Sequence, residues 1–174
     1  GYLSNYTLAY PILQKYGMKA TIFAIGVSFG KDHYKDTDYA MTPHFGAAEA
    51  AEMAASGLIS IQSHTYDMHQ WPPYEDGSAA VRENILQLPG ESEEAYVEAL
   101  TQDFTRSREV LQAATGRPVD VLAYPAGQYS TLAQVTLQTL GVHVTLSTNP
   151  GVNTVVKGLP QTLTAMLRFG VTED

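Results

Sequence analysis

The 174-residue chain carries 18 Asp and Glu against 10 Lys and Arg, and 44% of its residues are hydrophobic. This balance predicts one globular domain over residues 1–174 and argues against a nucleic-acid partner, because phosphate backbones attract basic surfaces. The chain has no Cys, which excludes disulfides and thiolate metal sites, and no apolar stretch near the roughly 20 residues that a membrane span requires.

Helical and strand-like patterns alternate along the chain. The predicted helices, each followed by a glycine, cover residues 3–16, 46–56, 92–115 and 130–140. The predicted strands, which are short and largely apolar, cover residues 19–25, 58–62, 119–124 and 142–148. This order is typical of an α/β fold with parallel strands, either a barrel or a doubly wound sheet. Because the alternation begins with a helix, a first strand is expected to be missing.

Two histidines follow directly after the strand at 58–62. His64 and His69 are five positions apart, so a helix would place them roughly 140° apart, which excludes a helical zinc motif. At a strand-to-loop turn both imidazoles can bind one metal ion, and Asp67 or Thr65 can orient the rings without contacting the metal. The alternative is two polar loop residues, of which His69 packs beside an aromatic patch.

The next predicted strand ends in the turn Tyr124-Pro125-Ala126-Gly127. Proline fixes φ and glycine permits close backbone approach, so this turn can point N–H groups into a cleft. Such donors can stabilise an oxyanion. The alternative is an ordinary turn that ends a strand.

The last predicted strand contains His143. His143, Thr145 and Ser147 alternate with apolar residues and therefore share one face, which is expected to point into a barrel. His143 is then a candidate general acid. The alternative is a structural histidine whose hydrogen bonds are satisfied within the fold.

Aromatic residues gather in two long predicted loops, at 27–45 and 63–90. These aromatic side chains include Tyr34, Tyr39, Trp71 and Tyr74. Their flat apolar rings could form a platform for a sugar. Packing of the loops against each other explains the same residues.

Three segments resemble the motifs of the NodB-type polysaccharide deacetylases, carbohydrate esterases that remove N- or O-acetyl groups from glycans. Gly1-Tyr2 looks like the end of the family's Thr-Phe-Asp-Asp-Gly motif. Residues 63–69 look like its second motif, in the variant with four residues between the histidines. Residues 124–127 resemble the third motif, whose amide after the proline belongs here to Ala126.

The resemblance implies a distorted (β/α) barrel and a divalent metal, usually zinc, that is held by one aspartate and two histidines, here His64 and His69. In the family the metal polarises the acetyl carbonyl, its bound water attacks, and a second aspartate acts as base. The Ala126 amide would supply the oxyanion hole. The residues that would contact substrate are Tyr124, Pro125, Gly127 and Trp71. The resemblance also implies an acetylated glycan as partner and an extracellular or cell-surface location.

The chain departs from the family pattern in ways that bear on activity. Both aspartates of the first motif fall before Gly1, the arginine of the third motif is absent, and Leu167-Arg168-Phe169 has phenylalanine where the last motif has histidine. Two imidazoles without a carboxylate bind a dication weakly, and loss of the base costs about 10²–10⁴-fold in rate. This truncated chain is therefore expected to be inactive or nearly so. The alternatives are a non-catalytic carbohydrate-binding module with this fold and a hydrolase of small amides.

Overall fold

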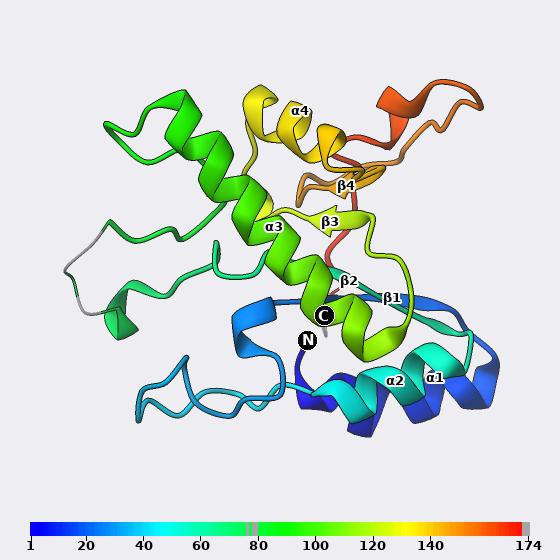
Figure 1. Cartoon of the computed structure of the whole chain (residues 1–174). Coiled ribbons are helices and arrows are strands. Elements are labelled where there is room, and N and C mark those ends of the chain that lie inside the picture. Colours follow the sequence, from blue (N-terminus) through cyan, green and yellow to red (C-terminus); the bar gives the residue numbers. More distant parts are fainter. Residues whose placement is uncertain (76, 78–79, 172–174) are drawn as a thin grey trace.

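A computed structural model describes residues 1–75, 77 and 80–171 of the chain. The strands of this described part form one parallel sheet in the order β1-β2-β3-β4 (Figure 1). They are β1 (Ala20–Ala24), β2 (Ile59–Ser63), β3 (Val121–Ala123) and β4 (Val144–Leu146). Because the strands run in the same direction, their carboxyl ends lie at one edge of the sheet. The predicted α/β class with parallel strands is confirmed.

The α-helices agree with the predicted ranges to within one or two residues, except at the first of them. They are α1 (Tyr10–Tyr16), α2 (Ala47–Ala55), α3 (Glu93–Thr115) and α4 (Thr131–Thr139). A π-helical segment, Asn5–Ala9, precedes α1, so the helix predicted at 3–16 is irregular in its first half. Shorter helical turns cover Gly26–Ser28, Pro72–Tyr74, Pro125–Gly127 and Pro160–Leu163. Among the described helices, none has both the length and the hydrophobicity of a membrane span.

Capping residues explain where α3 and α4 begin. The hydroxyl of Ser92 accepts a hydrogen bond from the N–H of Ala95 at 3.2 Å, and the hydroxyl of Ser130 accepts one from Ala133 at 3.1 Å. Each of these bonds satisfies one N–H group that the helix itself leaves free. At the other end of α3, Gly116 adopts a left-handed conformation with φ of 63°, which glycine does without steric cost.

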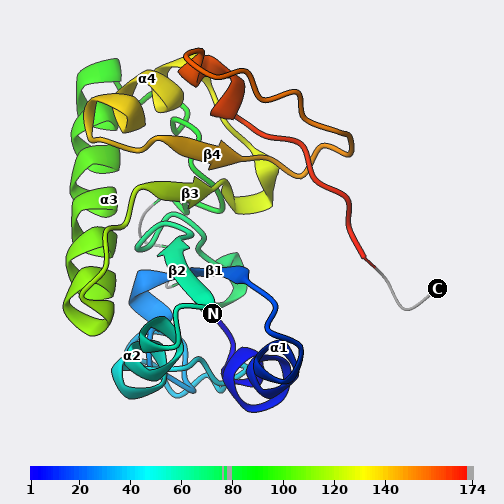
Figure 2. The ribbon, with the colours of Figure 1, turned by 90° about the vertical axis from the view of Figure 1, so that its right-hand side faces the viewer.

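Helix α3 packs across the sheet and joins the two halves of the core. In Figure 2, α1 and α2 lie near β1 and β2, α4 lies near β4, and α3 runs alongside both ends. Its side chains Tyr96, Leu100 and Phe104 belong to one buried cluster, and Leu111 belongs to the other. Each large apolar side chain that is buried contributes roughly 1.5–3 kcal/mol. Helix α3 is therefore the element that fixes the position of one half of the sheet against the other.

Strands β2 and β3 meet only close to their carboxyl ends. Their register consists of the single pair Ser63 and Leu122. Further back, the side chain of Gln62 fills the space between them, and its oxygen accepts the N–H groups of Asp120 at 3.1 Å and Val121 at 3.0 Å. The strands therefore converge where the turn with the two histidines follows β2.

Strand β1 is the outer strand on its side of the described sheet. The amino group of Gly1 donates to the carbonyl of Phe23 at 3.1 Å, and the N–H of Phe45 donates to the carbonyl of Gly1 at 3.1 Å. Gly1 thus lies along the free edge of β1. This arrangement agrees with the expectation that the sheet lacks its first strand in this chain.

Candidate functional site

His64 and His69 lie on a turn at the carboxyl end of β2. Their ring centroids are 5.2 Å apart and their ring planes meet at 84°. Between them, Thr65 is fully buried and has a φ of 71°, a left-handed conformation that costs a β-branched residue roughly 1–2 kcal/mol. The N–H of Thr65 donates to the hydroxyl of Ser63 at 3.0 Å, which helps to hold this turn. The turn brings the two imidazoles together, as predicted.

The hydrogen bonds of the two rings determine which nitrogen each ring presents. His64 Nδ1 lies 2.7 Å from the carbonyl oxygen of Ala123, and His69 Nδ1 lies 3.0 Å from that of Glu83. Because a carbonyl oxygen can only accept, both Nδ1 atoms carry the proton and both Nε2 atoms keep a free lone pair. Hydrogen bonds of this kind orient the histidine ligands of metal sites.

Burial keeps His64 in its neutral form. Desolvation lowers the pKa of His64 from 6.5 to about 4, and the nearby ring of His69 lowers it further, although the hydrogen bond to Ala123 acts in the opposite direction. A neutral imidazole is the form that binds a metal ion. His64 can therefore act as a ligand at neutral pH without first losing a proton.

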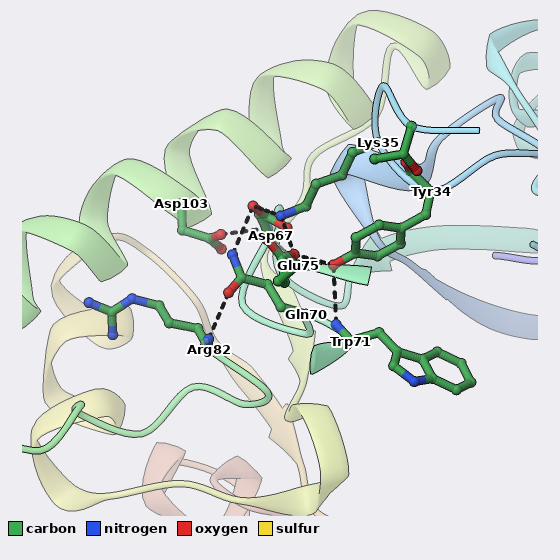
Figure 3. Close-up of polar contacts among 9 residues, drawn as sticks. Tyr34, Lys35, Asp67, Gln70, Trp71, Glu75, Arg82 and Asp103 are labelled. Atoms are coloured by element: carbon green, nitrogen blue, oxygen red, sulfur yellow. Dashed lines mark hydrogen bonds and ion pairs between the residues drawn. The ribbon is translucent and has the colours of Figure 1, made fainter. Parts of the chain in front are cut away.

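Thr65 and Asp67 were expected to orient the two rings, and this prediction is wrong. The hydroxyl of Thr65 is buried and has no hydrogen-bond partner among the described residues. The carboxylate of Asp67 instead contacts the Lys35 ammonium at 2.9 Å and the Gln70 amide at 3.1 Å (Figure 3). Backbone carbonyls already satisfy both Nδ1 atoms, so no side chain is needed for that role.

Asp103 of α3 holds the turn between the histidines. Its two carboxylate oxygens accept the N–H groups of Tyr66 at 2.8 Å and of Asp67 at 2.6 Å. Figure 3 shows Asp103 facing Asp67. Burial raises the pKa of Asp103 to about 6, although the two hydrogen bonds lower it. Sequence motifs miss this residue because it lies 36 positions from the turn that it supports.

The turn after β3 presents the predicted amide. Ala126 is exposed and has a φ of 52°, and no described residue accepts a hydrogen bond from its N–H. Backbone strain of this kind costs about 1–3 kcal/mol and is concentrated at functional sites. An N–H that has no described acceptor and lines the same cavity as His69 is suited to bind an oxygen on which negative charge develops.

We expect Gly127→Ala to destabilise the protein by roughly 2–4 kcal/mol. Gly127 has a φ of +69°, and a Cβ there would lie 2.1 Å from Thr148 Oγ1 and 2.8 Å from the Thr148 backbone nitrogen. Gly116→Ala is the matched control, since its φ is +63° but no atom lies within 4 Å of the added Cβ; its expected loss is about 1 kcal/mol. Urea unfolding measures both variants, and equal losses would contradict the steric account of the turn.

The two histidines lie where two cavities adjoin. Both rings line a cavity of about 380 Å³, together with Gly1 and Arg168. A second cavity of about 420 Å³ is lined by His69, Ala126 and Trp71 among others. Because His69 lines both spaces, a ligand in the second cavity would lie against His69 and Ala126, with His64 in the adjoining cavity. Arg168 was not predicted at the site, although it lies in the segment compared with the family's last motif.

The structure does not bring His143 to this site. Its N–H donates to the carbonyl of Asp120 at 2.8 Å, just before β4 begins, so it lies at the amino end of the sheet, opposite His64. Thr145 and Ser147 are buried, whereas His143 is exposed. The predicted shared face and the predicted general acid are therefore wrong. A larger cavity of about 650 Å³, also near the amino ends of the strands, is lined by none of the predicted site residues.

The predicted substrate contacts divide into two groups. Tyr124 is fully buried, with its ring stacked on Tyr129 at 5.0 Å, and Pro125 is buried as well. These two side chains are enclosed by the core, so the prediction is wrong for them. Gly127 is half-buried and offers only backbone. Trp71 is 59% exposed and lines the cavity of about 420 Å³, so it remains a candidate contact.

The residues present fit part of a metal site. Within the described ranges, no group of three or more His, Cys, Asp or Glu side chains is placed to hold a metal ion. His64 and His69 match two of the three protein ligands that catalytic zinc sites use, because both Nδ1 atoms are anchored and both Nε2 atoms are free. The carboxylate that the resemblance implies would come before Gly1, which lines the same cavity.

A family profile and three known proteins resemble this chain. The family profile described as Polysaccharide deacetylase matches residues 1–145. YxkH of Bacillus subtilis (strain 168) is 30% identical over 151 residues, which are 87% of this chain and 43% of YxkH. The poly-beta-1,6-N-acetyl-D-glucosamine N-deacetylase of Staphylococcus aureus (strain MRSA252) is 29% identical over 122 residues, 70% of this chain and 36% of that protein. The structure of IcaB from Ammonifex degensii has a TM-score of 0.75 and 26% identity, and the match covers 99% of this chain and 65% of that one.

These likenesses settle the fold and the family. The match to IcaB over nearly the whole chain confirms the distorted (β/α) barrel of the deacetylase type. The chain spans less than half the length of the two curated relatives. The residues that the family profile matches include both histidines of the turn after β2 and the turn at Ala126. The chain belongs to the polysaccharide deacetylase family.

Proposed function

We propose that this chain carries the site of a metal-dependent hydrolase that removes acetyl groups from an acetylated polysaccharide. One observation carries the proposal: among the described residues nothing bonds to Nε2 of His64 or His69, and His69 lines the same cavity as Ala126, whose N–H has no described acceptor. An acetylated glycan is the proposed partner, because the Staphylococcus aureus relative is named as an N-deacetylase of poly-beta-1,6-N-acetyl-D-glucosamine. An extracellular or cell-surface location follows from such a substrate and belongs to the same proposal.

The proposed mechanism gives each residue of the site one task. His64 and His69 would hold the metal through Nε2; imidazole suits zinc among other transition metals, and zinc is the metal that the family resemblance implies. A metal ion held there would supply polarisation of the acetyl carbonyl and a lower pKa for a bound water molecule. The carbonyls of Ala123 and Glu83 keep both protons on Nδ1, so the rings stay in the tautomer that can bind metal. The N–H of Ala126 donates a hydrogen bond to the acetyl oxygen as it becomes negative.

The carboxylate ligand and the base are proposed to come from the Asp-Asp motif that the family places before Gly1. Two imidazoles alone leave most of the charge of a dication uncompensated. Residues 1–174 by themselves should therefore bind zinc weakly and show little or no hydrolysis.

A non-catalytic carbohydrate-binding module is the second candidate function. It is favoured by the exposed rings of Tyr39 and Trp71, which are 51% and 59% accessible. It is also compatible with a site in which two histidines have no carboxylate partner among the described residues. Both candidate functions require glycan binding, but only the hydrolase releases acetate.

Acetate release from N-acetylglucosamine oligomers distinguishes the two functions. In a protein that carries the Asp-Asp motif directly before Gly1, we expect zinc-dependent release that His64→Ala lowers by at least about 100-fold. His143→Ala, which changes an exposed histidine at the far end of the sheet, should leave the rate unchanged, and EDTA should abolish it. Equal rates with and without His64 would contradict the hydrolase proposal. Oligomer binding without acetate release would favour the binding module.

A further inference from the structure

The two histidine rings are held in different ways. His64 is the less exposed of the two, and its Nδ1 bonds to the carbonyl of Ala123, the last residue of β3. His69 is exposed, and among the described residues its ring bonds only to the carbonyl of Glu83, at 3.0 Å. Glu83 lies in a stretch, residues 80–91, that contains no helix and no strand. The orientation of His69 therefore depends on what fixes the Glu83 carbonyl.

Arg82, directly before Glu83, is bonded to the segment that carries His69. The backbone N–H of Gln70 donates to the carbonyl of Arg82 at 2.9 Å. The backbone N–H of Arg82 donates in return to the side-chain oxygen of Gln70 at 2.7 Å (Figure 3). Because Gln70 follows His69 and Glu83 follows Arg82, these two bonds place the Glu83 carbonyl beside the imidazole.

The side chain of Arg82 is tied to the start of α3. Its guanidinium donates to both carboxylate oxygens of Glu91, from Nη1 to Oε2 at 3.2 Å and from Nη2 to Oε1. A pair of such bonds fixes direction as well as distance. The two side chains are only 16% and 12% exposed, so salt screens them less than it screens a surface pair. Glu91 directly precedes Ser92, the residue that caps α3.

A second anchor lies on the other side of Glu83. Ile85 is fully buried, and its carbonyl accepts the hydroxyl of Tyr96 at 2.6 Å. Each residue of a chain keeps two soft backbone dihedrals, so an anchor two residues away leaves the direction of the Glu83 carbonyl open. Arg82 is adjacent to Glu83, and its ion pair removes that freedom.

We propose that Arg82 is a positioning residue for His69. Its ion pair with Glu91 holds the Glu83 carbonyl against the imidazole, and this keeps the proton of the ring on Nδ1 and the lone pair on Nε2. The proposal rests on the proposed function only for the use of that lone pair as a metal ligand, since the effect on the ring requires no metal. His64 has its acceptor on β3 and does not depend on this ion pair.

Nitrogen-15 spectra of Arg82→Met in EDTA test the proposal, with His64 as a control within the same molecule. At about pH 8 an imidazole is ordinarily neutral, so the nitrogen shifts report the tautomer. We expect His69 to lose its single tautomer and to show averaged shifts at both nitrogens, while His64 stays protonated at Nδ1. A His69 ring that keeps its proton on Nδ1 would overturn the proposal. An equal change in both rings would overturn it too, because that result indicates general loosening of the fold.

Variants of the partner and of a distant arginine separate the ion pair from other effects. Glu91→Gln should disturb His69 as Arg82→Met does, although Glu91 does not contact the ring, and Arg82→Lys should disturb it less because it keeps the charge. If Arg82→Met does not fold, these two variants carry the test. Arg117→Met is the matched control, since Arg117 is exposed and lines the cavity near the amino ends of the strands. An undisturbed His69 in Glu91→Gln, or a disturbed one in Arg117→Met, would refute the role of the ion pair.

Zinc affinity separates this proposal from the proposed function. Arg82→Met should weaken zinc binding to residues 1–174 about 10-fold, the smaller effect of a residue that orients a ligand without contacting the metal. If the tautomer of His69 changes in Arg82→Met but the unaltered protein binds no zinc, the positioning role stands and the metal-dependent hydrolase fails. If the unaltered protein binds zinc and Arg82→Met changes neither the tautomer nor the affinity, the hydrolase proposal stands and the positioning role fails.

Discussion

Replacing His64 or His69 with alanine is expected to weaken zinc binding by more than about 100-fold, beyond detection in residues 1–174. Each substitution removes one of two Nε2 atoms that are free to bind metal. The described residues contain no group of three or more His, Cys, Asp or Glu side chains placed to hold a metal ion, so no complete site elsewhere in them would mask the loss. Competition with a coloured zinc chelator measures the affinity.

The matched controls for this prediction are His33→Ala and His143→Ala. Both histidines are exposed, and neither lines the cavity that contains the histidine pair. They therefore remove an imidazole without touching the proposed site. Zinc affinity should fall in the variants at positions 64 and 69 and should stay unchanged in the two controls. A comparable loss in either control would show that zinc binds elsewhere on the chain.

Asp103→Asn is expected to weaken zinc binding about 10–100-fold, the usual effect of replacing a residue that orients metal ligands without contacting the metal. The carboxylate accepts two N–H groups, those of Tyr66 and Asp67, and an amide of the same shape has only one acceptor. Its NH₂ group would face the second N–H, so the turn between the histidines must shift. Measurement of zinc affinity and of thermal unfolding on the same samples tests this prediction.

The expected result for Asp103→Asn is a change in zinc affinity with little change in stability. Loss of one hydrogen bond destabilises the turn, but removal of a partly buried charge offsets that loss, since burial raises the pKa of Asp103 to about 6. Glu98→Gln is the control on the same helix, because Glu98 is exposed and bonds only to Gln102 among the described residues. Unchanged zinc affinity in Asp103→Asn would refute a positioning role for Asp103.

Local rules predicted the helices and the order of the strands. Ser92 and Ser130 accept N–H groups at the starts of α3 and α4, and Gly116 ends α3 in a left-handed conformation. These features depend on neighbouring residues, which the sequence displays directly. The strands predicted at 19–25, 119–124 and 142–148 were too long, whereas β2 has the predicted length and lies one residue later. At the start of β3 the side chain of Gln62 replaces part of the ladder.

The error at His143 has a local cause. The N–H of Val142 bonds to the carbonyl of Leu137 at 3.0 Å, so residues 141–143 belong to the turn after α4 and not to the strand. Strand alternation therefore begins only at Val144, and the rule of alternating faces does not extend back to His143. The prediction for Tyr124 failed for another reason. Tyr124 directly follows β3 and its N–H still bonds to the carbonyl of Leu146 at 2.9 Å. Because a parallel sheet is buried on both faces, the ring of Tyr124 lies in the core.

The histidine pair was predictable, but the groups that orient it were not. His64 and His69 are close in sequence and follow a strand, which is a local pattern. Their hydrogen-bond acceptors are backbone carbonyls 59 and 14 positions away, at Ala123 and Glu83. Every residue type has a backbone carbonyl, so the sequence does not mark these two acceptors. Asp103 contacts the turn from helix α3. Such contacts depend on the tertiary fold, which a single sequence does not display.

Nitrogen-15 NMR of the histidine side chains during a zinc titration tests the central claim most directly. His64→Ala and His69→Ala spectra assign the signals. Before zinc is added, we predict that both rings are protonated at Nδ1 and unprotonated at Nε2. During the titration, the Nε2 signals of both rings should shift together and saturate at one zinc per chain. A shift confined to one ring, or two rings that saturate separately, would contradict a shared metal site.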